Sequence, residues 1–462
     1  MMIKSKLHNQ KAITIDFPKI VFVILLLIFF AYGVFIARTL DGGIIPDEPA
    51  HLLMSKHYST TMGIPADTAE TITSTGWIIS HNPFLYYWIN GRIINVILLV
   101  YPVATDWQLM VALRLINLVY ALGSVFFCYL ISKEFIKSQW YQLLPPFLLT
   151  NTLMFVILSS GVNYDNLAVL CSMAGLFFLL RVLNEKEFLR NSLAWMICIS
   201  IGTLVKYPIL PLALFMVITW LIYVVKKRES ILPFPKLDRK LILMISGLVI
   251  LLGGNAAIYG YNLVAFKGIL PNCPDLYPNA FCDLSPYVAR YNAFAMDHKL
   301  SIIESVQMGY PDPLEYVATV WIPTMFDRFF GIAGYKVYYP FYIFYFQLLI
   351  AWIILMAVRY WKDITFKLIS GVFIVTAYTI TLLIYNFQTE LIYGFRNFAL
   401  TGRYLFPVVG LIYGLYGFTL ELIRNKILQI LTLLGTIALF LMFGPVQFLW
   451  HYNGVFSSWF LR

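Results

Sequence analysis

The run IVFVILLLIFFAYGVFIA (residues 20–37) decides the fold class, because it is almost wholly apolar and close to the ~20 residues that cross a bilayer as a helix. Similar runs recur along most of the 462 residues, which are 60% hydrophobic and only 12% charged. Soluble domains carry about twice that charged fraction. Backbone amides in lipid must be satisfied within their segment, and continuous apolar runs exclude a β-barrel, whose strands alternate. The sequence therefore predicts an all-α polytopic membrane protein.

We predict about 11 transmembrane helices in one integral-membrane domain, residues 1–462. Their expected positions are 18–40, 107–131, 141–160, 164–183, 192–207, 209–225, 241–264, 340–358, 367–386, 403–421 and 427–449. A cleaved signal peptide is the competing interpretation of the first run, which follows Lys4, Lys6 and Lys11. The run is too long for a typical signal and lacks a small-residue cleavage site after it. We therefore expect a retained span.

The charge pattern gives the orientation. If the N-terminus is cytoplasmic, every predicted inner loop is basic, as the positive-inside rule requires. These loops hold Lys133, Lys137, Arg181, Lys186, Arg190, Lys226, Lys227, Arg228, Lys236, Arg239, Lys240, Arg359, Lys362, Lys367, Arg424 and Lys426. The net charge of +10 is then explained by topology rather than by a nucleic-acid partner.

This orientation places two large segments outside the cytoplasm, about 41–106 and 265–339, and a short one at about 387–402. Large loops on one side indicate one functional face. Residues 83–101 are apolar, but counting them as a span would reverse all later loops. We therefore expect them to form a helix that lies in the membrane interface.

The first outer segment carries an acidic cluster, Pro46-Asp47-Glu48-Pro49-Ala50-His51. A helix that begins near Asp47 places Asp47 and His51 on one face, four residues apart. Asp47 is suited to act as a general base for a hydroxyl, although capping the helix is its structural alternative. Two adjacent carboxylates near lipid need a cation, a metal or a substrate hydroxyl. The sequence leaves open whether Asp47 and Glu48 bind a divalent cation.

Basic residues at the predicted outer face run against the positive-inside rule. The set is Arg114, Lys206, Arg328, Arg396 and Arg403. An anionic phosphate is their expected partner, since Arg offers a bidentate fork and Lys a point charge. The alternatives are contact with lipid phosphates and ion pairs with Asp165 or Asp327.

Further polar residues fall at the same predicted face. Asn163-Tyr164-Asp165-Asn166 begins the fourth span, where it either caps the helix or binds substrate hydroxyls. His81 and the other histidines stand singly and show no metal-ligand spacing. Cys273 and Cys282 lie together in the second outer segment, where either a disulfide or two free thiols is expected.

Nucleotide-binding motifs are absent: the sequence has no Walker loop and no Gly-x-Gly-x-x-Gly after a strand. Nucleotide sugars are cytoplasmic, so a transferase that faces outwards needs a donor carried in the membrane. A polyprenyl-phosphate sugar, with an anionic head and an apolar tail, meets that need.

These features resemble the GT-C superfamily of integral-membrane glycosyltransferases, which includes protein O-mannosyltransferases and lipid A aminoarabinose transferases. Asp47-Glu48 resembles its acidic motif after span one, and His81-Asn82-Pro83-Phe84 resembles its segment before an interfacial helix, with Asn82 where relatives carry Pro. The chain is more similar to a bacterial membrane-protein family of this superfamily that is known mainly by sequence. The shared motifs are Pro46 to His51, Asn163 to Asp165, Lys206 to Pro208, and Gly402 to Pro407, which includes Tyr404.

The resemblance implies a role for each matching residue. Asp47 is the general base or positions the acceptor, supported by Glu48 and His51, while Lys206 and Arg403, with Arg114 as a further candidate, bind the donor phosphate. Arg328 is a phosphate-binding candidate from its charge at the predicted outer face. His81, Asn163, Asp165 and Tyr404 are expected to contact substrate. No cofactor is implied.

The sequence thus favours an inverting glycosyltransferase in the plasma membrane, with its site on the extracytoplasmic side. It would use a polyprenyl-phosphate sugar donor and a glycan, lipid or protein of the cell envelope as acceptor. The main alternative is a transporter or flippase for a lipid-linked or anionic solute, which would place charges midway along spans. A scaffold for envelope assembly is the third hypothesis.

Overall fold

The computed structural model describes residues 16–231, 238–288, 300–309, 311–330, 332–333, 336–337, 365–393, 400–450 and 457–461. The first half of the chain forms the helices α1 (Phe17–Thr39), α2 (Glu48–Ser59), α3 (Ala69–Thr75), α4 (Leu85–Val100), α5 (Asp106–Phe135), α6 (Leu144–Thr150), α7 (Leu153–Ser159), α8 (Asp165–Leu183), α9 (Phe188–Val205) and α10 (Ile209–Ile231). The second half forms α11 (Arg239–Asn255), η2 (Ala256–Gly260), α12 (Tyr261–Phe266), α13 (Cys273–Leu276), α14 (Asn279–Cys282), α16 (Ile302–Met308), α17 (Pro313–Glu315), η3 (Tyr316–Trp321), α18 (Ile322–Phe330), α20 (Phe366–Tyr393), η5 (Gly402–Val408), α21 (Val409–Glu421), α22 (Lys426–Phe443) and α23 (Pro445–Trp450). Besides the short turns η1 (Tyr141–Leu143) and η6 (Ser457–Trp459), one antiparallel pair occurs, β1 (Ile332–Ala333) with β2 (Lys336–Val337).

The protein is an all-helical, multi-pass membrane protein. Among the described residues, nine helices are long and apolar enough to span a bilayer. A tenth span is counted if the pair Tyr141–Thr150 and Leu153–Ser159, which bends by 65°, is taken as one. These ten correspond to ten of the 11 predicted spans, and the eleventh, 340–358, lies outside the described residues.

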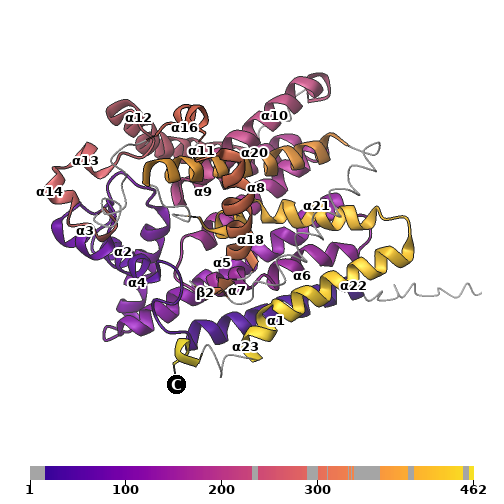
Figure 1. Ribbon diagram of the computed structural model, residues 1–462, viewed down its shortest axis with the longest axis horizontal. Helices are drawn as coiled ribbons and strands as arrows, with labels where there is room; N and C mark the ends of the chain where they lie inside the picture. Colours follow the sequence, from indigo (N-terminus) through magenta and orange to yellow (C-terminus); the bar gives the residue numbers. More distant parts are fainter. Residues whose placement is uncertain are drawn as a thin grey trace, which may run out of the picture.

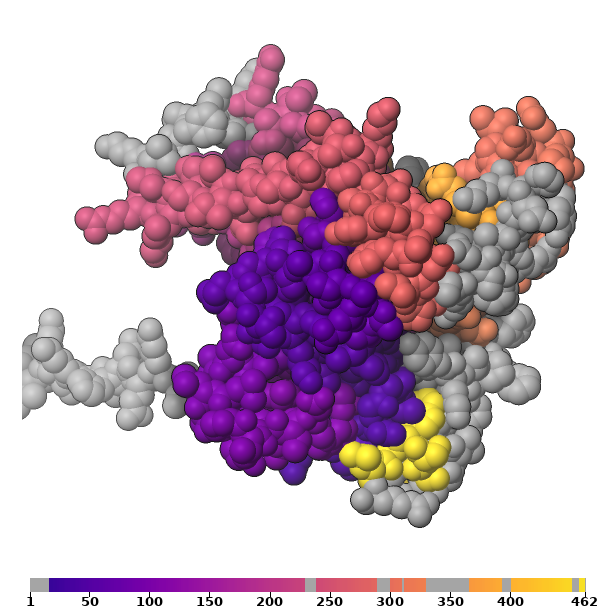
Figure 2. Space-filling model, turned by 90° about the vertical axis from the view of Figure 1, so that its left-hand side faces the viewer, coloured from indigo at the N-terminus to yellow at the C-terminus, as the bar shows by residue number. Residues whose placement is uncertain are grey.

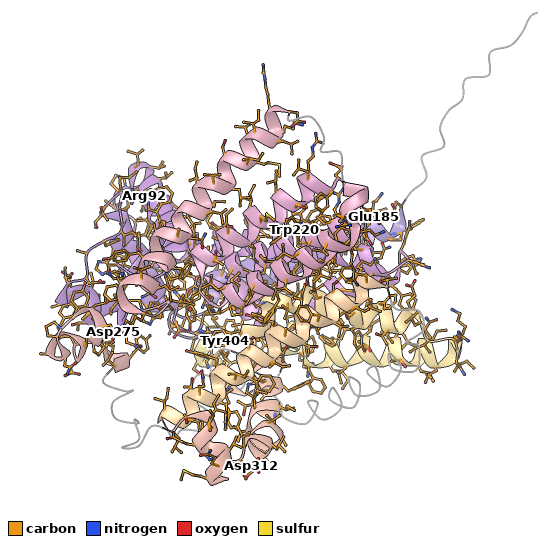
Figure 3. All side chains as sticks on the ribbon, turned by 90° about the horizontal axis from the view of Figure 1, so that it is seen from above. Arg92, Glu185, Trp220, Asp275, Asp312 and Tyr404 are labelled. Atoms are coloured by element: carbon orange, nitrogen blue, oxygen red, sulfur yellow. A yellow bond between two sulfur atoms is a disulfide. The ribbon has the colours of Figure 1, made fainter. Side chains whose placement is uncertain are left out.

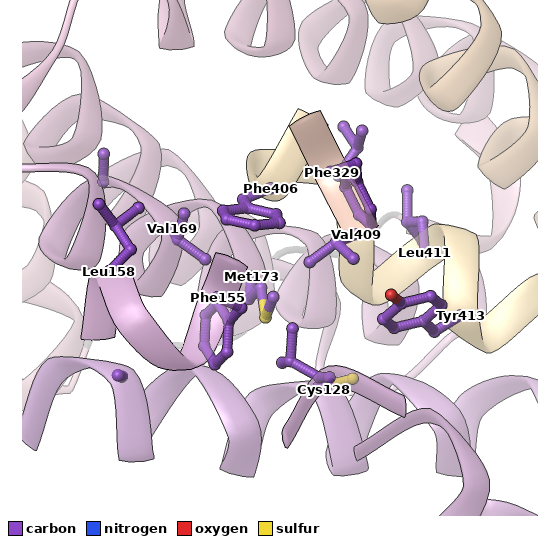
Figure 4. Packing of buried hydrophobic residues seen from close by; sticks show 14 of the residues in the cluster. Cys128, Phe155, Leu158, Val169, Met173, Phe329, Phe406, Val409, Leu411 and Tyr413 are labelled. Carbon is purple, nitrogen blue, oxygen red and sulfur yellow. The ribbon is translucent and has the colours of Figure 1, made fainter. Parts of the chain in front are cut away.

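Helix α8 forms the centre of the bundle. Buried residues make up 83% of its apolar window, compared with 28% for α1 at the surface. It packs against α5, α9 and η5. Figure 4 shows the core beside it, where the Phe406 ring packs against Phe155 at 5.7 Å and Phe329 at 5.1 Å between ring centroids. This packing fixes the position of η5 against the bundle.

The long helices run roughly from left to right in Figure 1, and the short helices α2, α3, α13 and α14 gather at the left-hand end. Figure 2 looks at that end, where the N-terminal segment in indigo and purple lies beside the red segment near residue 280. The segments 41–106 and 265–288, far apart in sequence, thus cover the same end of the bundle.

Helix α4 occupies the apolar stretch for which we predicted an interfacial helix. Its 16 residues extend for about 24 Å, which is less than the ~30 Å of a bilayer core. It packs closely on α2, because Gly91 leaves no room for a side chain: a Cβ there would lie 2.7 Å from the carbonyl carbon of Tyr58. Its position relative to the membrane stays a prediction.

A disulfide joins Cys273 in α13 to Cys282 in α14. This small module is hydrogen-bonded to the segment 41–106 at two points. The Tyr277 hydroxyl donates to Asp67 Oδ2 at 2.9 Å, and the Ser285 hydroxyl donates to the Gly76 carbonyl at 2.7 Å. The module therefore supports the loop that carries Trp77.

Candidate functional site

Asp47 lies directly before α2 with a backbone φ of 63°, in the left-handed region. Residues other than glycine rarely adopt this conformation, and Asp is among those that tolerate it best. The side chain does not cap the helix. Instead, Arg403 Nη2 donates a hydrogen bond of 2.7 Å to Asp47 Oδ2. The strained backbone therefore aims the carboxylate at Arg403 and not at the free amides of α2.

Four charged side chains meet here, and we call Asp47, Asp165, Lys206 and Arg403 the charged quartet. Lys206 Nζ contacts Asp165 Oδ1, and Arg403 Nε lies 3.6 Å from Asp165 Oδ2. Asp165 is the first residue of α8, Lys206 follows the end of α9, and Arg403 belongs to η5. The ion pair with Asp165, one of the alternatives for the basic residues, is therefore present for Lys206. Arg396, of the same predicted set, lies outside the residues that the structure describes.

Two tyrosine rings enclose the lysine of the quartet. Lys206 Nζ lies 4.5 Å from the ring centroid of Tyr164 and 4.6 Å from that of Tyr404, so both faces stabilise the cation. Figure 3 shows Tyr404 near the middle of the molecule. Three residues of the quartet are buried, since Asp165 is 4% exposed, Lys206 5% and Arg403 8%, whereas the Asp47 side chain is 27% exposed.

Burial and charge set the protonation of the quartet. Burial lowers the pKa of Lys206 to about 8, although Asp165 opposes the shift. Burial alone would raise the pKa of Asp47, but the charge and the hydrogen bond of Arg403 outweigh it and hold the pKa below its usual value. At neutral pH Asp47 is therefore an anion and Lys206 a cation.

Hydrogen-bonding capacity is left over in the quartet. Arg403 Nε, Arg403 Nη1 and Asp165 Oδ2 are buried, yet none of them makes a hydrogen bond with any residue in the described ranges. Buried polar groups in proteins are almost always paired. An unpaired guanidinium N–H is expensive to bury, and it is suited to receive an oxygen from a substrate.

Glu48 and Arg114 form a second, separate ion pair in which both side chains are fully buried. Arg114 Nε and Nη2 donate to the two Glu48 oxygens at 2.8 and 2.6 Å, and Nη1 donates to the carbonyls of Ala37 and Leu40. The last N–H points to the Asp41 carbonyl at 3.4 Å, which accounts for all five donors of the guanidinium. The phosphate-binding role predicted for Arg114 is therefore not supported by the geometry.

Glu48 likewise acts within the protein. Besides Arg114, its Oε1 accepts a hydrogen bond of 2.9 Å from the Val162 amide, which precedes α8. The pair thereby joins the end of α1, the start of α2, α5 and the turn before α8. Glu48 therefore supports Asp47 indirectly. Its bonds to Arg114 and to the Val162 amide fix the backbone beside Asp47, and they do not involve the quartet.

His51 lies one turn after Asp47 and is fully buried. Its Nδ1 is hydrogen-bonded to the Tyr87 hydroxyl at 2.9 Å, whereas Nε2 has no partner in the described part of the chain. The rings of Trp77 and Tyr164 lie 5.3 and 4.6 Å from the imidazole, centroid to centroid. Burial lowers the pKa of His51 to about 3, so the ring is neutral.

Asn163 links the turn that contains Asp47 to the first residue of α8. Its Nδ2 donates to the Pro46 carbonyl at 3.1 Å, and its Oδ1 accepts from the Asp165 amide at 2.8 Å. The second bond satisfies a free amide of α8, as the capping alternative proposed. Both polar ends of Asn163 are therefore used inside the protein.

Two other predicted residues have partners outside the quartet. His81 Nδ1 is hydrogen-bonded to Asn262 Oδ1 at 2.9 Å, which joins the segment 41–106 to α12. Arg328 in α18 donates to the Leu400 carbonyl, and burial lowers its pKa. Within the described residues, neither side chain has a recorded bond to the quartet. Arg328 nevertheless supports the segment that leads into Arg403.

The part of the chain that the structure describes contains no set of side chains suited to bind a metal ion. No group of three or more His, Cys, Asp or Glu side chains lies close enough there to hold an ion. The two carboxylates considered for a metal, Asp47 and Glu48, are paired with different arginines.

The sequence analysis did not identify Tyr87 and Trp77, which contact His51, or the cation-binding role of Tyr164. The aromatic density of Trp77, Tyr86, Tyr87 and Trp88 was the available signal. It was ambiguous, because aromatic residues in such a segment equally indicate contact with the membrane interface.

Comparison with known proteins places this geometry in context. Residues 82–251 match the family model of dolichyl-phosphate-mannose-protein mannosyltransferases. Asp165 and Lys206 fall within the matched region, whereas Asp47 and Arg403 lie outside it. No curated protein sequence matches the chain significantly.

Several solved structures are similar. The apo oligosaccharyltransferase of Archaeoglobus fulgidus has a TM-score of 0.50 and 12% identity, over 96% of this chain and 56% of that one. AglB of the same organism, in complex with an inhibitory peptide and a dolichol-phosphate, gives 0.49 and 13%, over 94% and 56%. ArnT from Cupriavidus metallidurans, bound to undecaprenyl phosphate, gives 0.46 and 13%, over 90% and 62%.

The chain spans between 56% and 62% of the length of these three structures. The oligosaccharyltransferase with a TM-score of 0.50 supports a common fold, and the family model supports a relationship in sequence. In part of its sequence and in its fold, the chain is therefore similar to the GT-C superfamily of integral-membrane glycosyltransferases, which confirms the resemblance seen in its motifs.

Proposed function

We propose that this protein transfers a sugar from a polyprenyl-phosphate donor to a hydroxyl group of a cell-envelope acceptor, which is a glycan, a lipid or a protein. The quartet would face the extracytoplasmic side of the plasma membrane, beside the outer segments 41–106 and 265–339. The match to a mannosyltransferase family supports the class of reaction. ArnT, in a structure of similar fold, binds undecaprenyl phosphate.

The unpaired donors of Arg403 are the observation that carries the proposal. Nε and Nη1 are buried beside Lys206, and neither makes a hydrogen bond with a described residue. A phosphate group offers the acceptor oxygens that these donors lack, and a guanidinium can bind it through two N–H groups at once. Asp47 already lies on the same guanidinium, 2.7 Å from Nη2. A phosphate bound to Arg403 would therefore lie next to the carboxylate.

The chemistry follows from this arrangement. Asp47 accepts the proton of the acceptor hydroxyl, whose oxygen attacks the anomeric carbon. The bond from that carbon to the phosphate oxygen breaks, and its electron pair leaves with the polyprenyl phosphate. Attack opposite the leaving group inverts the anomeric centre. Arg403 and Lys206 stabilise the charge that develops on the phosphate.

Binding of the donor also adjusts the base. Without the donor, the charge and the hydrogen bond of Arg403 hold the pKa of Asp47 below its usual value, which makes the carboxylate a weak proton acceptor. A phosphate that shares Arg403 weakens this stabilisation and raises the pKa of Asp47 towards its usual range. The base thus becomes effective when the donor is present. No step requires a metal.

Mass spectrometry of envelope glycans and lipids tests the proposal in cells that lack the gene. We expect one sugar to disappear in the deletion and to return with the wild-type protein but not with Asp47→Asn. Asp41→Asn is the matched control, because Asp41 is exposed and, within the described residues, its carboxylate accepts a hydrogen bond from the adjacent Gly42 amide and none from the quartet. A full sugar profile with folded Asp47→Asn would contradict the proposal and favour transport or a scaffold role.

A further inference from the structure

His51 has a buried imidazole nitrogen with no hydrogen-bond partner in the part of the chain that the structure describes. The side chain is 0% exposed, and Nε2 makes no hydrogen bond with any described residue. Nδ1, by contrast, is held at 2.9 Å by the Tyr87 hydroxyl. A side chain with one nitrogen fixed and the other left unpaired is suited to bind a ligand through the second.

The Tyr87 hydroxyl determines which nitrogen carries the proton. Tyr87 is 6% exposed, and His51 Nδ1 is its hydrogen-bond partner in the described part of the chain. A buried hydroxyl needs an acceptor for its hydrogen, so Tyr87 donates to Nδ1. The proton of the neutral imidazole is then on Nε2. His51 therefore offers an N–H donor and no positive charge.

Aromatic rings place His51 beside the quartet. The Tyr164 ring contacts the imidazole edge-on at 4.6 Å, and the same ring lies 4.5 Å from Lys206 Nζ. The Trp77 ring also lies near the imidazole, at 5.3 Å between ring centroids. Aromatic surface with a few directed polar groups is the usual lining of a site for a neutral organic group. The phosphate charge is already met by Lys206 and Arg403.

We propose that His51 Nε2–H donates a hydrogen bond to a hydroxyl of the sugar that is transferred, and that Tyr87 is a positioning residue that fixes the tautomer and orientation of His51. The inference rests on the proposed function and adds to it a group that recognises the sugar itself. The phosphate is bound by the quartet and the sugar by His51, so the two parts of the donor depend on different residues.

Two substitutions of His51 separate the two nitrogens. In His51→Gln the side-chain amide reaches the position of Nε2, whereas in His51→Asn it reaches only that of Nδ1. We expect His51→Gln to restore most of the sugar in deletion cells and His51→Asn to restore about tenfold less or lower. Purified wild type and both variants should bind undecaprenyl phosphate, which has no sugar, with the same affinity. Thermal unfolding checks that each variant is folded.

Tyr87→Phe keeps the ring and removes the hydroxyl, which tests the positioning role even if the His51 variants fold poorly. We expect a loss of about tenfold in sugar transfer in the wild-type background and little further loss in His51→Gln, since glutamine has no tautomer to fix. Tyr58→Phe is the control, because Tyr58 stacks on Tyr87 and its hydroxyl has no recorded bond to His51.

The outcomes are distinct. Equal transfer by His51→Asn and His51→Gln, or equal losses for Tyr87→Phe in both backgrounds, would overturn the inference. Weaker binding of undecaprenyl phosphate by His51→Asn would also overturn it, because Nε2 would then contact the phosphate. If the wild type itself restores no sugar, the proposed function fails and the inference fails with it.

Discussion

Arg403 Nη2 and Asp47 Oδ2 lie 2.7 Å apart, although 356 residues separate them in the chain. The two residues come from the turn before α2 and from η5, and each is held there by its own local structure. Their contact joins the proposed base to the proposed phosphate-binding residue. A substitution of one residue should therefore alter the charge or the position of the other.

Replacement of Arg403 by lysine keeps the charge and removes the planar fork. We expect the affinity for undecaprenyl phosphate to fall by about 10- to 100-fold, because a lysine cannot supply Nε and Nη donors at once. Binding to purified protein in detergent measures this. Arg239→Lys, at an exposed position at the start of α11, is the control. Unchanged affinity in Arg403→Lys would show that the fork does not hold the phosphate.

The pH dependence of transfer should have an alkaline limb near pH 8. Lys206 has to be protonated to bind phosphate, and burial lowers its pKa to about 8, so kcat/KM falls as the pH rises through this value. Lys206→Arg should move the limb upwards, because arginine stays protonated. An identical limb in both proteins would assign it to another group. Transfer assays between pH 6 and 10 decide the question.

The acidic limb of the pH dependence of transfer should report the protonation of Asp47. Since Arg403 holds the pKa of Asp47 below its usual value, the carboxylate stays charged to a lower pH than an ordinary aspartate does. Transfer by the free enzyme should therefore persist at mildly acidic pH and decline only below it. In Arg403→Lys, whose weaker contact raises the pKa of Asp47, the decline should begin at higher pH. Stable protein at each pH is verified by circular dichroism.

Glu48→Gln should destabilise the protein rather than alter its chemistry directly. The change leaves Arg114 buried with no counter-charge, which costs about 3–5 kcal/mol in the free energy of unfolding. Asp106→Asn breaks an exposed pair with Lys56 and should cost less than about 1 kcal/mol. Denaturation of the two variants in parallel measures the difference. Equal stabilities would contradict the structural role of Glu48.

Gly402→Ala should displace Arg403. A Cβ at Gly402 would lie 2.4 Å from the backbone nitrogen of Phe329 in α18, so η5 and α18 have to move apart. Displacement of a binding group by about 1 Å costs on the order of 100-fold in rate. Gly435→Ala in α22 meets no atom within 4 Å and should retain full transfer. Assays of both variants at equal protein level provide the comparison.

Much of the fold could be predicted from the sequence, since ten predicted spans coincide with described helices. Bilayer thickness and the need to satisfy backbone amides constrain each span locally, so the local composition of the sequence is sufficient to predict where the spans lie. The sequence could also identify four candidate site residues, Asp47, Asp165, Lys206 and Arg403. Charged residues at the ends of apolar helices are energetically costly unless they have a partner or a function.

The sequence by itself thus determined the all-helical membrane class, the approximate spans and the charged residues of the site. Only the tertiary structure decided their partners: Arg114 is used by Glu48, Arg403 is shared between Asp47 and Asp165, and Tyr87 holds His51. The physical reason is distance along the chain. These contacts join residues up to 356 positions apart, and which donor meets which acceptor depends on how the helices pack, which no local pattern records.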